Sequence, residues 1–209
     1  MKKVFNCFVI LLVMVCIDHV ASAQVNSVRI ISTPKAGMIT IHAKELLASQ
    51  ITSRCDVKIV DGDNAQLNIE LATEKMSYPE SYRIVDKGNT HIRIVGSDER
   101  GLLYGVGKFL RTSRFDQGGF TAGSWRGTSS PTGKMRGMYL ASHFNNFYEA
   151  APIEEVQKYL DELALWGINY VVVTVPQFQF TGFNDPVAQK AITRLKQIMN
   201  AAKTNGMKV

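Results

Sequence analysis

Cysteine is scarce in this sequence, and its placement excludes a fold held by internal disulfides. The 209 residues contain three cysteines. Two of them, Cys7 and Cys16, lie in an amino-terminal segment with the pattern of an export signal, so only Cys55 remains once that segment is removed. Cys55 follows a predicted helix and has no histidine near it in sequence, which favours a small buried thiol over a nucleophile. Packing must therefore stabilise the mature chain.

Long runs of lysine and arginine are also missing. The chain has 24 basic and 18 acidic residues and a formal net charge of +6. Without Lys2, Lys3 and Asp18 of the amino-terminal segment, 22 basic and 17 acidic residues remain. The basic residues are spread over predicted helices and strands, which is typical of a solvated surface and not of a groove for phosphates. We therefore expect no nucleic-acid partner.

Motifs for nucleotides, metals and activated nucleophiles are absent as well. Three glycines lie between residues 101 and 107, but Gly105-Val106-Gly107 has no third glycine at the required offset, and Phe109 stands where a phosphate loop has Ser or Thr. We interpret them as small residues that let a helix lie close to a sheet. His42 has no partner four residues on, and no Ser/His/Asp spacing supports a peptidase. We expect no metal and no cofactor.

The first 23 residues have the order of a cleavable signal peptide. Lys2-Lys3 precedes an apolar run from Val4 to Ile17, and the small residues of Ala21-Ser22-Ala23 come directly before Gln24. Asp18 breaks the apolar run before it reaches the roughly 20 residues that span a bilayer. We predict cleavage between Ala23 and Gln24, no stable membrane anchor, and a periplasmic or secreted protein.

Strand and helix signals mix irregularly through the next hundred residues. Alternating residues on either side of Lys87-Gly88-Asn89 predict an antiparallel hairpin, and Ser97 or Asp98 can cap the helix that follows it. The remaining predicted elements are strands at 25–31, 57–60 and 67–71 and a helix at 38–53. The composition then shifts to Gly, Ser, Thr and Pro from Gln117 to Lys134, which predicts a linker. Its Trp125 is expected to pin the chain against one domain, and a platform that stacks on a sugar is the less favoured alternative.

Beyond this segment the pattern changes to strand, helix, strand, helix, strand. Arg136 to Ala141 is a predicted strand, and Ile168 to Val175 is an apolar run expected to be buried on both faces of a parallel sheet. The predicted helices are one between Pro152 and Gly167, and one that Asn184 or Asp185 caps and Gly206 ends. Met207-Lys208-Val209 begins a further strand.

Five segments carry a resemblance to a known group of enzymes. They are Tyr82 to Val85, His91 to Gly96, Gly101 to Gly105, Arg136 to Leu140, and Leu163 to Asn169. The first three resemble the small α+β amino-terminal domain of exo-acting glycoside hydrolases, including β-N-acetylhexosaminidases and α-glucuronidases. The last two resemble the first barrel strand of those enzymes and the entry to the second.

The resemblance implies a fold class and a division into domains. We expect an α+β accessory domain, with a mixed sheet and two helices, at residues 24–116, and a linker at 117–135. The first βα units of a truncated (β/α)8 barrel are expected at 136–209. A whole barrel needs about 250 residues, so we expect the front part of a longer protein.

Such enzymes hydrolyse glycosides with two carboxylates that flank the scissile bond. The resemblance implies that this pair lies on later barrel strands, beyond Val209, so the catalytic residues are unknown. Glu154 and Glu155 are instead expected in the first turn of a helix, where their charge suits the helix dipole.

Substrate-binding residues can be proposed at the ends of the first two barrel strands. Barrel enzymes gather substrate at the carboxyl-terminal edge, where the sequence has His143, Asn145 and Asn146, with Ser142 beside them, after the first strand and Gln177 after the second. Amide and imidazole groups suit sugar hydroxyls. A packing or capping role for the histidine is equally compatible with the sequence.

One departure bears on the substrate. The hexosaminidase pattern has an arginine near the exit of the first strand, whereas this chain reads Leu140-Ala141-Ser142-His143-Phe144. This weakens N-acetylhexosamine as the sugar and leaves a glucuronidase-like or other specificity open.

The leading hypothesis is the amino-terminal part of an exported glycoside hydrolase that acts on carbohydrate. The fragment alone is expected to be inactive. The alternative is a non-catalytic carbohydrate-binding or scaffold protein with a degenerate barrel, because a fold does not fix a function.

Overall fold

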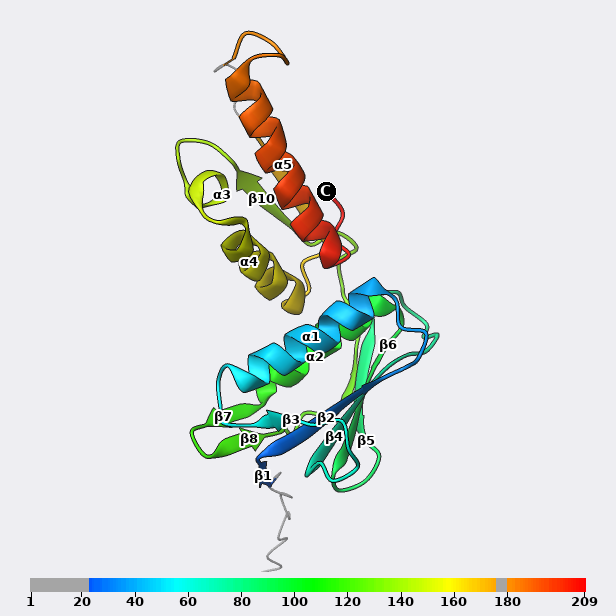
Figure 1. Cartoon of the computed structure of the whole chain (residues 1–209). Coiled ribbons are helices and arrows are strands. Elements are labelled where there is room, and N and C mark those ends of the chain that lie inside the picture. Colours follow the sequence, from blue (N-terminus) through cyan, green and yellow to red (C-terminus); the bar gives the residue numbers. More distant parts are fainter. Residues whose placement is uncertain (1–22, 176–179) are drawn as a thin grey trace, which may run out of the picture.

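A six-stranded mixed sheet forms the centre of the amino-terminal half (Figure 1). The computed structural model describes residues 23–175 and 180–209. The strand order is β3-β2-β4-β6-β5-β9, in which β2, β3, β4 and β6 are parallel and β5 and β9 are antiparallel to their neighbours. The strands are β2 (Ser27–Ser32), β3 (Lys58–Ile59), β4 (Leu67–Thr73), β5 (Tyr82–Asp86), β6 (His91–Gly96) and β9 (Gly127–Ser129).

Two helices, α1 (Met38–Thr52) and α2 (Glu99–Thr112), cover one face of this sheet (Figure 1). The alternating residues of β4 turn Leu67, Ile69 and Leu71 into the core, while Glu70 lies on the open face and pairs with Arg93 at 2.9 Å. The predicted hairpin of β5 and β6 is confirmed. Asp98 caps α2 by accepting a hydrogen bond from the Gly101 amide at 2.8 Å, as expected.

The segment expected to be a linker, 117–135, contains two strands. The strand β8 (Gly119–Thr121) lies between β1 (Gln24–Val25) and β7 (Arg114–Asp116) in a small antiparallel sheet, and β9 joins the large sheet. Phe120 of β8 is fully buried against Phe109 and Phe115. Much of this segment therefore belongs to the packing of the amino-terminal half, and the proposed domain boundary stays a prediction.

The carboxyl-terminal half consists of βα units. Its elements are β10 (Gly137–Ala141), α3 (Phe147–Ala150), α4 (Ile153–Leu165), β11 (Tyr170–Thr174) and α5 (Pro186–Thr204). The strands β10 and β11 are parallel, and Lys208 bridges to Tyr170 in the same direction. This third pairing agrees with the strand predicted at 207–209, and Asp185 caps α5 as predicted. The short helix α3 was not anticipated.

One face of the β10–β11 pair is open. Leu140 and Val171 are buried beneath the helices, whereas Tyr139 is 60% exposed and Val172 is 44% exposed on the other face. The expectation that the valine run is buried on both faces is therefore wrong for this chain. The described residues confirm an α+β fold with a mixed sheet, and they do not form a closed barrel.

The two halves pack through their helices. Gly107 of α2 lies so close to the end of α4 that a Cβ there would come within 1.9 Å of the Leu165 carbonyl oxygen. A buried cluster lies at each side of this contact. Glu80 accepts hydrogen bonds from Arg136 and Asn169 and pairs with Arg100, and His42 of α1 meets Asp161 of α4 at 3.0 Å.

Within the described residues, no helix is both long and apolar enough to cross a membrane.

Candidate functional site

The carboxyl-terminal edge of β10 and β11 is shaped by a tight loop at residues 142–146. Ser142 is buried, and its amide donates to the Thr174 carbonyl at 2.8 Å, so the strand pairing continues one residue past β10. Phe144 and Asn145 then adopt left-handed backbone angles, with φ values of 59° and 54°. Such angles cost a residue with a side chain about 1–2 kcal/mol each, so the surrounding contacts must hold this loop in place.

Asn146 makes two of the contacts that keep this loop in place. Its side-chain oxygen accepts a hydrogen bond from the Glu149 amide at 3.2 Å, and its side-chain nitrogen donates to the Ala141 carbonyl at 2.5 Å. It thereby caps α3 and ties the loop to β10. Both ends of the amide have a partner within the protein, which leaves Asn146 as a residue that positions the loop.

The neighbouring residues are more available to a ligand. The Asn145 side chain is exposed, and its backbone amide donates to the Glu149 carboxylate at 2.6 Å. His143 packs edge-on against the exposed Phe144 ring, with 4.3 Å between ring centroids. Its Nδ1 atom is buried and has no hydrogen-bond partner among the described residues. The fourth predicted site residue, Gln177, lies outside the described residues.

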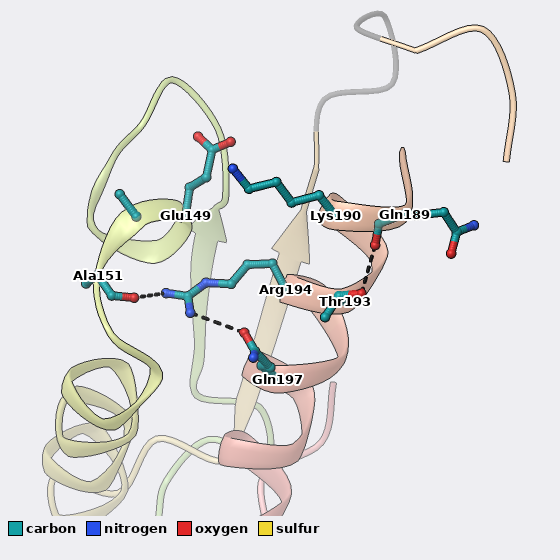
Figure 2. Close-up of a pocket in the computed structure, with 8 residues that line it drawn as sticks. Glu149, Ala151, Gln189, Lys190, Thr193, Arg194 and Gln197 are labelled. Carbon is teal, nitrogen blue, oxygen red and sulfur yellow. Dashed lines mark hydrogen bonds between the residues drawn. The ribbon is translucent and has the colours of Figure 1, made fainter. Parts of the chain in front are cut away.

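Two adjoining hollows open beside this loop, between α3 and α5. One has a volume of about 490 Å³ and the other about 370 Å³. Both are lined by Glu149, Lys190 and Arg194, and the second also reaches Ser142. Figure 2 shows the Glu149 and Lys190 side chains pointing toward one another across the first hollow.

Arg194 connects the two walls of the hollow. Its Nε atom donates to the Tyr148 carbonyl at 2.7 Å. Its Nη2 atom donates to the Ala151 carbonyl at 2.7 Å, a bond that Figure 2 shows. Both carbonyls lie at the end of α3, where no following helical turn supplies an amide to bond them. The Arg194 guanidinium therefore fixes α3, and with it the loop at 142–146, against α5.

Burial around α3 also affects its aromatic residues. Burial raises the pKa of Tyr148 to about 12, and a hydrogen bond with Tyr159 acts in the same direction. Tyr148 therefore stays a neutral phenol at physiological pH and serves as packing between α3 and α4.

At the start of α5, hydrogen bonds from the backbone amides of Thr181 and Val187 lower the pKa of Asp185, so this helix cap stays ionised.

The hollows are lined by groups that can form hydrogen bonds or ion pairs. They offer one carboxylate, one ammonium group, one guanidinium group, a hydroxyl from Thr193 and amides from Gln189 and Gln197. Glu149 is the only carboxylate among the described residues that line them. The sequence interpretation did not assign Glu149 to catalysis, and it did not single out Lys190 or Arg194. No local signal marks Arg194, because its partners lie 43 and 46 residues earlier in the chain.

Comparison with solved structures gives a consistent result. The chain matches a glycoside hydrolase of family 138 that targets pectin rhamnogalacturonan II, with a TM-score of 0.64 and 15% identity over 87% of this chain and 30% of that one. It matches the Flavobacterium johnsoniae chitobiase with a TM-score of 0.62 and 19% identity over 90% and 31%. The chain has a glycoside hydrolase-like fold.

A third match extends the range of such enzymes. A family 115 4-O-methyl-α-glucuronidase with specificity for decorated arabinogalactans superposes with a TM-score of 0.61 and 14% identity over 90% of this chain and 29% of that one. The chain thus spans about a third of the length of these three structures. No protein-family model and no curated protein matches the sequence. These likenesses show the fold alone.

Proposed function

We propose that this chain supplies the accessory domain and the opening βα units of the catalytic barrel of an exported glycoside hydrolase. The observation that carries the proposal is the joint arrangement of both halves. The mixed sheet, its two helices and the parallel β10 and β11 together resemble three glycoside hydrolases over 87–90% of the chain. A resemblance of the sheet alone would support an accessory domain only.

In this proposal the loop at 142–146 contributes to the substrate site. Parallel strands of a barrel present their carboxyl-terminal ends to the substrate, and His143, Asn145 and Gln177 follow the ends of the two strands. Lys190 and Glu149 add an ammonium group and a carboxylate beside them. The ammonium group is suited to a uronic acid carboxylate, which fits the glucuronidase-like specificity better than N-acetylhexosamine.

The first test is to sequence the encoding DNA past the codon for Val209 and to assay the whole gene product. We expect an open frame with further βα units, a carboxylate pair at later strand ends, and release of sugar from chito-oligosaccharides, glucuronidated arabinogalactan or rhamnogalacturonan II. Removing either carboxylate should lower kcat by about 10²–10⁴. A stop codon directly after Val209 would contradict the enzyme proposal, and binding without hydrolysis would favour the carbohydrate-binding alternative.

The rim residues can be tested in the same gene product. His143→Ala and Asn145→Ala should each reduce kcat/KM by about tenfold, which corresponds to one lost hydrogen bond. Asn200→Ala, an exposed amide on α5, is the matched control and should leave kcat/KM unchanged. Equal values for all three variants would remove the loop from the proposed site.

Export has a separate test. The protein recovered from the periplasm or the medium should begin at Gln24, as read by mass spectrometry. Gln24 is also the first residue of β1, so cleavage before it leaves this strand whole. Recovery of the intact chain from the cytoplasm would contradict export.

A further inference from the structure

The end of α4 carries an exposed tryptophan in an unusual setting. Trp166 is 67% exposed, although tryptophan is highly buried on average. It lies at the carboxyl-terminal end of α4, which faces α1 and α2 of the other half (Figure 1). Because α4 runs back from the carboxyl-terminal edge of β10, this residue is at the opposite edge from the loop at 142–146.

The indole is held rigidly from one side. The Arg111 guanidinium lies over the ring, 4.3 Å from its centroid, and donates to the Leu165 carbonyl at 2.5 Å. The close approach at Gly107 brings α2 near enough for this contact. One face of the ring is therefore covered by a cation, and the high exposure leaves the rest of the ring open to solvent. A platform fixed in this way loses little entropy when a ligand stacks on it.

Polar side chains lie beside the platform. Glu162 lies one turn before Trp166 on α4 and accepts a hydrogen bond from Gln50 of α1 at 2.8 Å. Arg54, in the turn that follows α1, pairs with the same carboxylate at 3.9 Å. Burial lowers the pKa of Arg111, and the charges of Tyr82 and Glu162 act against that shift. The Glu162 and Arg54 side chains remain 47% and 44% exposed.

We propose that Trp166, with Glu162, Arg111, Gln50 and Arg54, forms a second carbohydrate-binding site that takes a pyranose ring of an oligosaccharide. The negative face of the indole attracts the weakly positive C–H bonds on one side of a sugar ring. The Glu162 carboxylate and the Arg54 guanidinium can hydrogen-bond neighbouring hydroxyls, with geometry set by the planar fork of arginine, while Arg111 positions the indole from its covered face. The choice of a sugar as the ligand rests on the proposed function. The exposure of the Trp166 ring and its contact with Arg111 do not depend on that function.

The site can be tested by tryptophan fluorescence, compared between the wild type and variants of Trp125 and Trp166, the two tryptophans among residues 1–209. Trp125 is partly buried, stacked on Tyr82 at 5.9 Å with Lys108 over its ring at 5.0 Å. In the whole gene product, titration with cellohexaose, xylohexaose and chitohexaose should give a saturable change in tryptophan emission with at least one of them. The Trp125→Phe variant should keep this change.

The variants separate binding from packing. Trp166→Ala should remove the part of the emission change that Trp166 contributes and weaken binding of the same hexasaccharide, measured by calorimetry, by at least about tenfold. Tyr78→Ala removes an aromatic ring of similar exposure elsewhere and should bind as the wild type does. If none of the three sugars changes the emission of the wild type, or if Trp166→Ala lowers only the stability, the proposal is overturned. Hydrolysis of substrates by these variants reports independently on the proposed function.

Discussion

Glu80 shows how one residue can determine how the two halves are joined. Its side chain is 9% exposed and lies between Arg100, at 3.0 Å, and Arg136, with Asn169 donating at 3.1 Å. Its backbone is left-handed, with a φ of 58°. A carboxylate removed from water in this way is stable only while all its partners remain.

We therefore expect Glu80→Gln to be strongly destabilising. The variant keeps the shape of the side chain but leaves two guanidinium groups without their counter-charge, so the free energy of unfolding should fall by about 3 kcal/mol. Urea denaturation measures this loss. Glu155→Gln, which removes an exposed pairing with Lys158, is the control and should unfold like the wild type. Equal stability of the two variants would show that the Glu80 cluster is dispensable.

His42 predicts a dependence on pH. The hydrogen bond to Asp161 raises the pKa of His42 against the opposing effect of burial, and Glu45 adds to the rise. A raised histidine pKa stabilises the fold fully below the ordinary value of about 6.5 and loses that contribution as pH rises through the shifted value. The wild type should therefore lose stability toward alkaline pH relative to His42→Gln. Chemical denaturation at several pH values tests this, and parallel curves would contradict it.

At the scale of elements, the contact between α2 and α4 depends on the absence of a side chain. A Cβ at Gly107 would meet a backbone oxygen, which no rotation of a side chain can relieve. Gly107→Ala should gain about 1 kcal/mol of helix propensity but lose about 1–3 kcal/mol through overpacking. We expect a net decrease of a few degrees in the melting temperature.

The control for this variant is Gly62→Ala. A Cβ there would meet nothing within 4 Å. Its melting temperature should stay at or slightly above that of the wild type, because alanine restricts the unfolded chain. If Gly107→Ala and Gly62→Ala had the same melting temperature, α2 and α4 would be able to move apart without loss of stability.

The elements also show what the sequence could and could not predict. The hairpin of β5 and β6 and the cap at Asp98 were predicted because their signals are local, in alternation and in turn chemistry. The strands β8 and β9 were missed because each has three residues rich in Gly, Ser and Thr, too short for a pattern. The strand β9 pairs with β5 and β8 pairs with β1, both far earlier in the chain, although β8 also pairs with the neighbouring β7.

The candidate site, too, could be predicted from the sequence only in part. His143, Asn145 and Asn146 could be placed at a strand end from the sequence, but the role of Asn146 as a cap could not, since it depends on where α3 begins. Lys190 and Arg194 reach this edge only because α5 packs beside α3.

For the whole molecule, we expect one cooperative unfolding transition. The Glu80 cluster and the pair of His42 and Asp161 both cross between the halves, and α2 packs directly on α4. Calorimetry should therefore give equal calorimetric and van't Hoff enthalpies. The double variant Glu80→Gln/Asp161→Asn weakens both clusters and should separate the transition into two. Two transitions in the wild type would show that the halves are energetically independent.

The buried Glu80 cluster also limits how this protein could be recombined with others. A chimaera that joins residues 24–130 to a foreign barrel would carry Glu80 and His42 without Arg136, Asn169 and Asp161. A junction placed in the segment rich in Gly, Ser, Thr and Pro would therefore leave charged side chains without their partners on both fragments. A viable exchange has to transplant those matching residues too, so the exchanged segment has to extend at least to Asn169, directly before β11.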